Sequence, residues 1–253
     1  MKITFLGTGT SQGVPVIACN CNTCLSNDSK DKRLRASVLI SIGNKNILID
    51  SGPDFRYQML RAKVQSLDAI LFTHEHKDHT GGLDDVRAYN WVTKQSMDVY
   101  AESRVLEALK VEYAYCFAPN PYPGIPKINL NTITENPFNL LDIEVIPIRG
   151  MHLKLPVLGY RIGDFAYLTD FNFISEEEKK KLTDLQVLVV NGVRKEKHIS
   201  HYSLPEAIAL IEEIKPHKGY ITHISHYLGL HAIENRELPH NISLTYDMQE
   251  LEI

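Results

Sequence analysis

The chain has 253 residues, 43% of them apolar, and a formal net charge of −4 at pH 7. This charge argues against a protein that wraps a long nucleic acid, because such binding depends on many Lys and Arg contacts to phosphates. No segment approaches the roughly 20 apolar residues of a membrane span, and the N-terminus lacks the apolar region and cleavage site of a signal peptide. We therefore expect a cytoplasmic protein with one domain over residues 1–253 and no membrane partner.

Short strands and helices alternate in the first half of the chain. Apolar or alternating composition predicts four strands: 3–6, 37–42, 46–50 and 68–73. The helical spacing of apolar residues predicts three helices: 54–62, 83–90 and 102–113. Gly43-Asn44 separates the second and third strands, which is typical of a β-hairpin. The strand over 68–73 is apolar at its centre, as a strand covered on both faces would be.

The second half repeats this mixture. Four further strands are predicted: 143–148, 157–162, 165–169 and 187–190. Helices over 175–182 and 203–214 each begin with a capping box, formed by Ser175 with Glu178 and by Ser203 with Glu206. Strands followed by helices in both halves predict an α/β sandwich, with mixed sheets inside and helices outside.

One segment differs from the rest of the chain. Residues 117–137 hold five prolines, at positions 119, 121, 123, 126 and 137, together with several asparagines. Such composition predicts a long irregular loop, which in a compact domain often serves as a lid or a binding loop. A plain surface insertion is the alternative interpretation.

Four residues with ligand chemistry lie within six positions directly after the strand over 68–73. They are His74, His76, Asp78 and His79. Imidazole nitrogens and carboxylate oxygens are the usual ligands of a hydrolytic metal ion. The loop that carries them must turn tightly, and Gly81-Gly82 supplies the conformational freedom for such a turn. This pattern predicts a metal site at the end of the strand.

A second metal signal is independent of the first. Cys19, Cys21 and Cys24 place three thiols within six residues. In the cytosol thiols are usually reduced, so clustered cysteines bind metal more often than they form disulfides. The spacing indicates a structural zinc site that still lacks one ligand, while a redox cluster or three unrelated buried cysteines are the alternatives. Cys116 stands alone and is expected to pack as a small apolar residue.

The pattern His74-x-His76-x-Asp78-His79 resembles the signature of the metallo-β-lactamase superfamily. The resemblance implies an αββα sandwich, in which two mixed β-sheets pack face to face with helices outside. It also implies that the first two histidines bind one metal ion and the Asp-His pair binds a second. The remaining ligands and their supporting carboxylate would come from later and earlier strand ends: His152, the bridging Asp170, His223 and the supporting Asp50.

Further motifs are similar to the PhnP group of this superfamily. They are the segment Leu6–Pro15, the cysteine cluster, the segment 48–56 and the run Thr222–His226. In that group a second C-terminal histidine completes the structural zinc site, which implies Cys19, Cys21, Cys24 and His226 here. PhnP is a phosphodiesterase that opens a cyclic ribose phosphate, and the related ribonuclease Z enzymes cut tRNA precursors.

The resemblance and the ligand set together predict a dinuclear metal-dependent hydrolase. Two ions would lower the pKa of a shared water and hold a bridging hydroxide, which attacks phosphorus. The resemblance implies that His201, in the loop before a late helix, donates a proton to the leaving group; His198 lies nearby, so the choice between them stays open. Asp78 and His201 are thus the expected catalytic residues. The active-site ligands suit zinc, manganese or iron, and the thiolates favour zinc.

The predicted substrate is a small or cyclic nucleotide-like phosphodiester. Hydrolysis of a thioester or lactone on the same fold is the main alternative. A ribonuclease Z-like nuclease is disfavoured by the negative charge and by the lack of a long basic or Gly-rich arm, and a scaffold without catalysis by the presence of all seven ligands. The relatives also suggest a homodimer.

Overall fold

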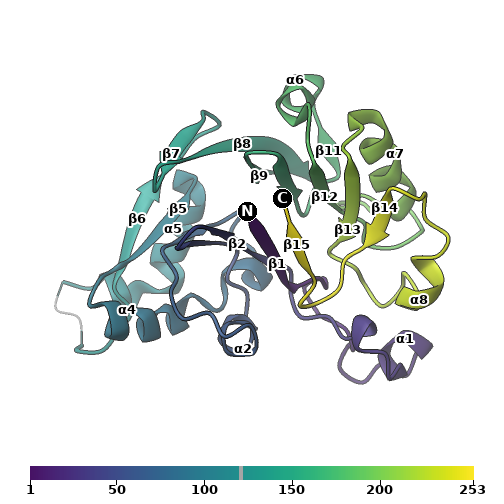
Figure 1. Cartoon of the computed structure of the whole chain (residues 1–253). Helices are drawn as coiled ribbons and strands as arrows, with labels where there is room; N and C mark the ends of the chain where they lie inside the picture. The colour runs from purple at the N-terminus through teal and green to yellow at the C-terminus, as the bar shows by residue number, and fades with distance from the viewer. Residues whose placement is uncertain (120–121) are drawn as a thin grey trace.

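Two β-sheets that face each other form the centre of the molecule (Figure 1). The computed structural model describes residues 1–119 and 122–253. In the described part the first sheet has seven strands, in the order β15 (Glu250–Glu252), β1 (Lys2–Gly7), β2 (Ser37–Ile42), β3 (Lys45–Ile49), β4 (Ala69–Leu71), β5 (Met97–Ala101) and β6 (Ile128–Thr132). Strands β15 to β3 pair antiparallel and β3 to β6 pair parallel, so the sheet is mixed.

The second sheet is also mixed. Its order is β11 (Phe173–Ile174), β8 (Ile143–His152), β9 (Leu155–Ile162), β10 (Phe165–Leu168), β12 (Val187–Asn191), β13 (Lys218–Thr222) and β14 (Ile242–Leu244), with β7 (Phe138–Leu140) paired to β8. Strands β10, β12, β13 and β14 run parallel, which brings their carboxyl ends to one edge of the sheet. The predicted sandwich of two mixed sheets is confirmed.

Apolar side chains fill the space between the sheets. This core includes Phe5, Tyr160 and Tyr167, all fully buried. Burying one large apolar side chain stabilises a fold by roughly 1.5–3 kcal/mol, so the packing of the two sheets contributes substantially to stability. The helices of the described chain are α1 (Asn22–Leu25), α2 (Phe55–Arg61), α3 (Lys77–Thr80), α4 (Arg87–Thr93), α5 (Ser103–Glu112), α6 (Glu176–Lys179), α7 (Leu204–Ile214) and α8 (His231–Glu234).

The longer helices cover the outer faces of the sandwich. Helices α2, α4 and α5 lie on the flank of the first sheet, and α7 lies on the flank of the second (Figure 1). The chain termini meet in the first sheet, where the amino group of Met1 donates to the carbonyl of Ile253 at 2.5 Å. Among the described residues, no helix combines the length and the apolar composition that a bilayer crossing requires.

Two local predictions need correction. The segment 117–137 is not irregular throughout, because β6 lies within it and pairs with β5 along its whole length. Pro121 of this segment lies outside the described residues. The capping box predicted at Ser175 is only half formed: Ser175 accepts from the Glu178 amide, but the Glu178 carboxylate accepts from the Arg149 amide instead. The box of Ser203 and Glu206 is formed as predicted.

Candidate metal centre

The ligand-type side chains predicted from the sequence converge where strands of both sheets end. The loop from His74 to His79 follows β4, and Asp170 and His223 follow β10 and β13. His152 was expected in a loop after residue 148, but it is the last residue of β8, since this strand continues in register with β9. Strands β10 and β13 both run parallel to β12, so their carboxyl ends lie at one edge of the second sheet, which explains how Asp170 and His223 meet.

The side chains form two sets with metal-ligand geometry. His74, His76 and His152 make one set, and Asp78, His79 and His223 make the other; within each set the ligand atoms lie within 4.8 Å of one another. Asp170 lies close to both sets. One of its oxygens groups with the ring nitrogens of His74 and His79 within 4.8 Å. Its Oδ2 is 3.1 Å from His79 Nε2, and its Oδ1 is 3.3 Å from His223 Nε2. The structure thus brings all seven predicted ligands together.

Hydrogen bonds fix the orientation of two of the histidine rings. Nδ1 of His79 donates to Asp50 Oδ2 at 2.6 Å. The Thr73 hydroxyl donates to the same oxygen at 2.8 Å and accepts from His74 Nδ1 at 2.9 Å. Both rings therefore carry their proton on Nδ1 and present the lone pair of Nε2 to the centre, which is the arrangement that supporting residues impose on metal-binding histidines.

His152 is oriented by a residue that the sequence did not reveal. Its Nδ1 donates to the backbone carbonyl of Ser200 at 2.7 Å, so its Nε2 also faces the other ligands. Any residue type can supply a carbonyl, which is why no motif marked Ser200.

Asp50, Asp170 and His223 all have positive φ angles, of 63°, 61° and 54°. L-residues adopt this region at a cost of about 1–3 kcal/mol each, and such conformations cluster at functional sites.

The buried ring nitrogens of the centre indicate whether it fits divalent cations. Nε2 of His74, His79 and His223 is buried and has no hydrogen-bond partner among the described residues. An unpaired buried acceptor is costly, and coordination of a cation would satisfy it. Burial alone would raise the pKa of the Asp170 carboxyl, but positive charge on the neighbouring His223 and His79 rings holds this pKa well below its usual range, and a bound cation would replace that charge. Lone pairs of nitrogen and anionic oxygens therefore face one point, as divalent metals require.

The two candidate proton donors occupy different positions. His201 Nε2 lies 2.8 Å from Asp170 Oδ1, at the ligand cluster itself. His198 lies behind it, with Nδ1 3.1 Å from His201 Nδ1. Burial lowers the pKa of His201, so its protonated form gives up a proton more readily. The geometry favours His201 over His198 as the side chain next to the reaction centre.

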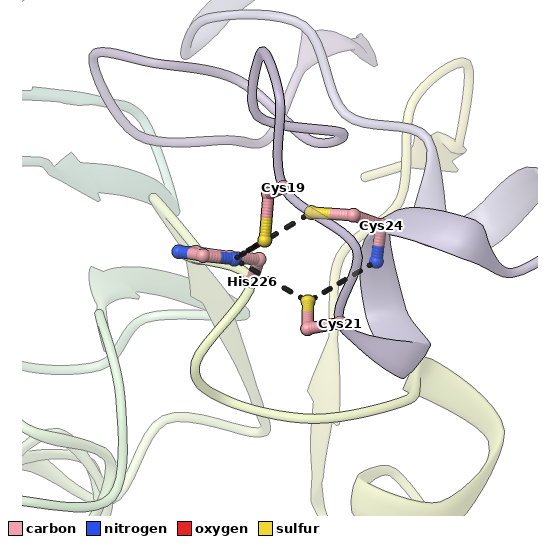
Figure 2. Close-up of side chains that lie close together, drawn as sticks. All are labelled: Cys19, Cys21, Cys24 and His226. Atoms are coloured by element: carbon pink, nitrogen blue, oxygen red, sulfur yellow. Dashed lines mark hydrogen bonds between the residues drawn. The ribbon is translucent and has the colours of Figure 1, made fainter.

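The three clustered cysteines meet a histidine from the other end of the chain (Figure 2). Sγ atoms of Cys19, Cys21 and Cys24 lie 3.3, 3.4 and 3.5 Å from Nδ1 of His226. Cys21 begins α1, and a hydrogen bond from the Cys24 amide to its sulfur lowers the pKa of the Cys21 thiol to about 6. Three thiols and one ring nitrogen around a common point match the donor set of a closed structural zinc site.

This cysteine cluster and the seven-ligand centre share one loop. His223 belongs to the centre and His226 to the cluster, and the loop between them is held by two backbone bonds. The Ile224 amide donates to the Thr8 carbonyl at 2.8 Å, and the Ser225 amide donates to the Val193 carbonyl at 3.1 Å. Tethering His226 to the N-terminal segment therefore also restrains the backbone of His223.

Known proteins share both the sequence and the fold of this chain. The family model of the β-lactamase superfamily domain matches residues 45–224. An octanoyltransferase of Porphyromonas gingivalis is 44% identical over 250 residues, which cover 98% of this chain and 50% of that protein. A ribonuclease Z of Mycobacterium sp. (strain KMS) is 24% identical over 179 residues, or 64% of this chain and 57% of that protein.

The crystal structure of a diphosphatase from the PhnP family superposes on this chain with a TM-score of 0.93. The two are 36% identical, and the alignment covers 99% of this chain and 96% of the other. The chain spans about half the length of the curated relatives it matches.

Proposed function

The chain belongs to the metallo-β-lactamase superfamily, in its PhnP-like group of metal-dependent hydrolases, and from this premise we propose that it cleaves a phosphorus–oxygen bond in a small phosphodiester or diphosphate. Nucleotide-like and cyclic phosphodiesters are the substrates we favour. The observation that carries the proposal is the convergence of two three-residue ligand sets on Asp170, with His201 beside them.

Each side chain has a distinct role in the proposed reaction. His74, His76 and His152 would hold one ion, while Asp78, His79 and His223 would hold the other. Two bound ions would lower the pKa of water for attack on phosphorus and neutralise charge on the phosphoryl oxygens. Asp170 lies close to His74 and His152 of one set and to His79 and His223 of the other, and would contribute to holding both ions.

His201 acts on the leaving group in this proposal. Only 14% of its side chain is exposed, and its Nε2 lies 2.8 Å from Asp170 Oδ1. A proton held at this nitrogen would pass to the departing oxygen, which otherwise leaves as a high-energy alkoxide. Zinc, manganese and iron all suit the nitrogen and oxygen donors, and zinc suits the cysteine cluster.

Two relatives support chemistry at phosphorus. The similar crystal structure is described as a diphosphatase, and a partial relative is named ribonuclease Z. A diphosphate bond and an RNA backbone bond both break by displacement at phosphorus, the step that a two-metal site assists. The proposed partner is accordingly a small phosphorylated molecule rather than a long nucleic acid, and a cytoplasmic homodimer remains part of the proposal.

A parallel assay tests the bond that is cleaved. The metal-loaded protein would be incubated with bis(p-nitrophenyl) phosphate, with a nucleoside diphosphate derivative and with an octanoyl thioester. We expect turnover of a phosphorus substrate and its loss in Asp78→Ala, since this change removes a ligand while leaving the core intact. Cleavage of the thioester alone would overturn the proposal.

Thioester hydrolysis is the second candidate because one relative is named octanoyltransferase. That protein is about twice as long as the stretch it shares with this chain. The same assay decides between the candidates, because both use one centre and differ only in the atom attacked.

A further inference from the structure

Arg104 contacts both segments that supply one set of metal ligands. It lies on α5, near the start of the helix. Its Nη1 forms an ion pair with the carboxylate of Glu75, the residue between His74 and His76. Its Nη2 donates to the backbone carbonyl of Pro156 at 2.6 Å. One guanidinium group therefore holds two segments that are far apart in sequence.

Pro156 connects this contact to the third ligand. In the β8–β9 hairpin Pro156 pairs with Met151, and the next pair joins His152 to Leu155. The residue whose carbonyl Arg104 holds is thus one pair away from His152 in this hairpin. Arg104 touches the loop of two ligands through Glu75 and the hairpin of the third through Pro156. It makes no such contact with Asp78, His79 or His223 in the described structure.

We propose that Arg104 and Glu75 are positioning residues for the His74–His76–His152 set, and that they hold these three side chains ready for one of the two ions. The inference rests on the proposed metal centre and adds that its two ion sites are supported separately. Arginine suits this role because its planar, rigid fork presents two separate nitrogens to two acceptors, whereas lysine offers one ammonium group on a flexible stem.

Neighbouring charges hold the Arg104 side chain in place. Glu102 Oε2 lies 4.0 Å from Arg104 Nη2 and also accepts from Arg149 Nη1 at 2.8 Å. Arg149 is paired further with Glu135, at 2.8 Å. Glu75 and Glu102 keep only 23% and 20% of their side chains exposed, so solvent screens these pairs less than it screens surface pairs. The arginine is therefore restrained on several sides.

Zinc titrations of Arg104→Met, Arg104→Lys and Glu75→Gln test the proposal. Lys110→Met on the same helix is the matched control, since Lys110 is exposed and, within residues 1–119 and 122–253, pairs only with Glu107. Chelator competition would measure the dissociation constant of each active-site ion, and His76→Ala would identify the ion held by the three histidines. Melting curves of the metal-free variants would report any general loss of folding.

We expect Arg104→Met and Glu75→Gln each to weaken the ion lost in His76→Ala by about 10–100-fold, the usual effect of removing a supporting partner. The other ion should change by less than about threefold, and Arg104→Lys should be intermediate. Equal weakening of both ions, or no change relative to Lys110→Met, would overturn the inference. So would opposite shifts in Arg104→Met and Glu75→Gln, because these would indicate an effect of charge alone.

The wild-type titration separates this inference from the proposed function. If the wild-type protein binds no pair of ions at the seven-ligand centre, the proposed function fails. If it binds both ions and the variants bind them equally well, only the role of Arg104 and Glu75 fails.

Discussion

Asp50 Oδ2 lies 2.6 Å from His79 Nδ1, and both side chains are completely buried. The same oxygen accepts from the Thr73 hydroxyl, which in turn holds His74. One carboxylate that faces no ion thus orients a ligand from each of the two sets. Burial raises the pKa of the Asp50 carboxyl. The hydrogen bonds from His79 and Thr73 oppose this effect and stabilise the buried carboxylate.

Asp50→Ala should therefore weaken both active-site ions, in contrast to the selective effect expected at Arg104. Loss of an outer partner usually lowers metal affinity by about 10–100-fold. Zinc titration of the purified variant measures this effect. Retention of wild-type affinity for both ions would show that His74 and His79 do not depend on Asp50.

The cysteine cluster should contribute to stability rather than to catalysis. Cys21→Ser removes one of the four donors of the cluster. We expect a melting temperature several degrees lower than that of the parent, because metal bound only by the folded chain stabilises it. Cys116→Ser is the control, since Cys116 lies outside the cluster. Calorimetry with zinc present measures the difference. Equal melting temperatures for Cys21→Ser and Cys116→Ser would argue against a structural zinc.

His201→Ala should reduce turnover most for substrates with poor leaving groups. General acid catalysis typically contributes about 10²–10⁴-fold, and it matters most when the departing oxygen is strongly basic. A series of aryl phosphodiesters with phenols of rising pKa measures this dependence. His198→Ala should cause a smaller loss, since His198 lies behind His201. A loss in His201→Ala that is uniform across the series would contradict proton donation.

We predict that protonation of His231 destabilises the fold in mild acid. Arg33 Nη2 lies 3.1 Å from His231 Nδ1, and both residues are buried. Burial, reinforced by the charge of Arg33, lowers the pKa of His231 to about 4. The unfolded chain, with a pKa of about 6.5, binds the proton first as the pH falls.

The neutral His231 therefore contributes up to about 3 kcal/mol to the free energy of unfolding. This contribution is complete above about pH 6.5 and is lost as the pH falls toward 4. Denaturant unfolding of the parent and of His231→Asn across this range measures it, because carboxylates and metal ligands titrate in both proteins and cancel in the difference. A difference in unfolding free energy that does not change with pH would exclude His231 as the source.

Sequence patterns predicted the strands correctly where apolar runs are long or are bounded by turn residues. The hairpin around Gly43-Asn44 and the buried strand before His74 are examples. Strand β5 was missed although its buried and half-buried residues alternate from Met97 to Ala101. Strands β6 and β15 could not be found locally, because prolines surround the first and the second has only three residues, paired with β1.

The candidate site was predictable to a similar degree. Histidine and aspartate carry their chemistry in the side chain, so motifs at strand ends marked the seven candidate ligands that the structure brings together. The residues that orient them were less visible. Ser200 acts through a backbone carbonyl, and Arg104 acts through contacts that only the folded chain creates. Such support depends on three-dimensional packing rather than on spacing.

Anomalous diffraction from a crystal grown with zinc tests the central claim most directly. We predict two peaks about 3.5–4 Å apart between the histidine sets, with Asp170 reaching both, and a third peak among Cys19, Cys21, Cys24 and His226. A map with no peak among His74, His152, Asp170 and His223, in a crystal whose cysteine cluster holds zinc, would contradict the account.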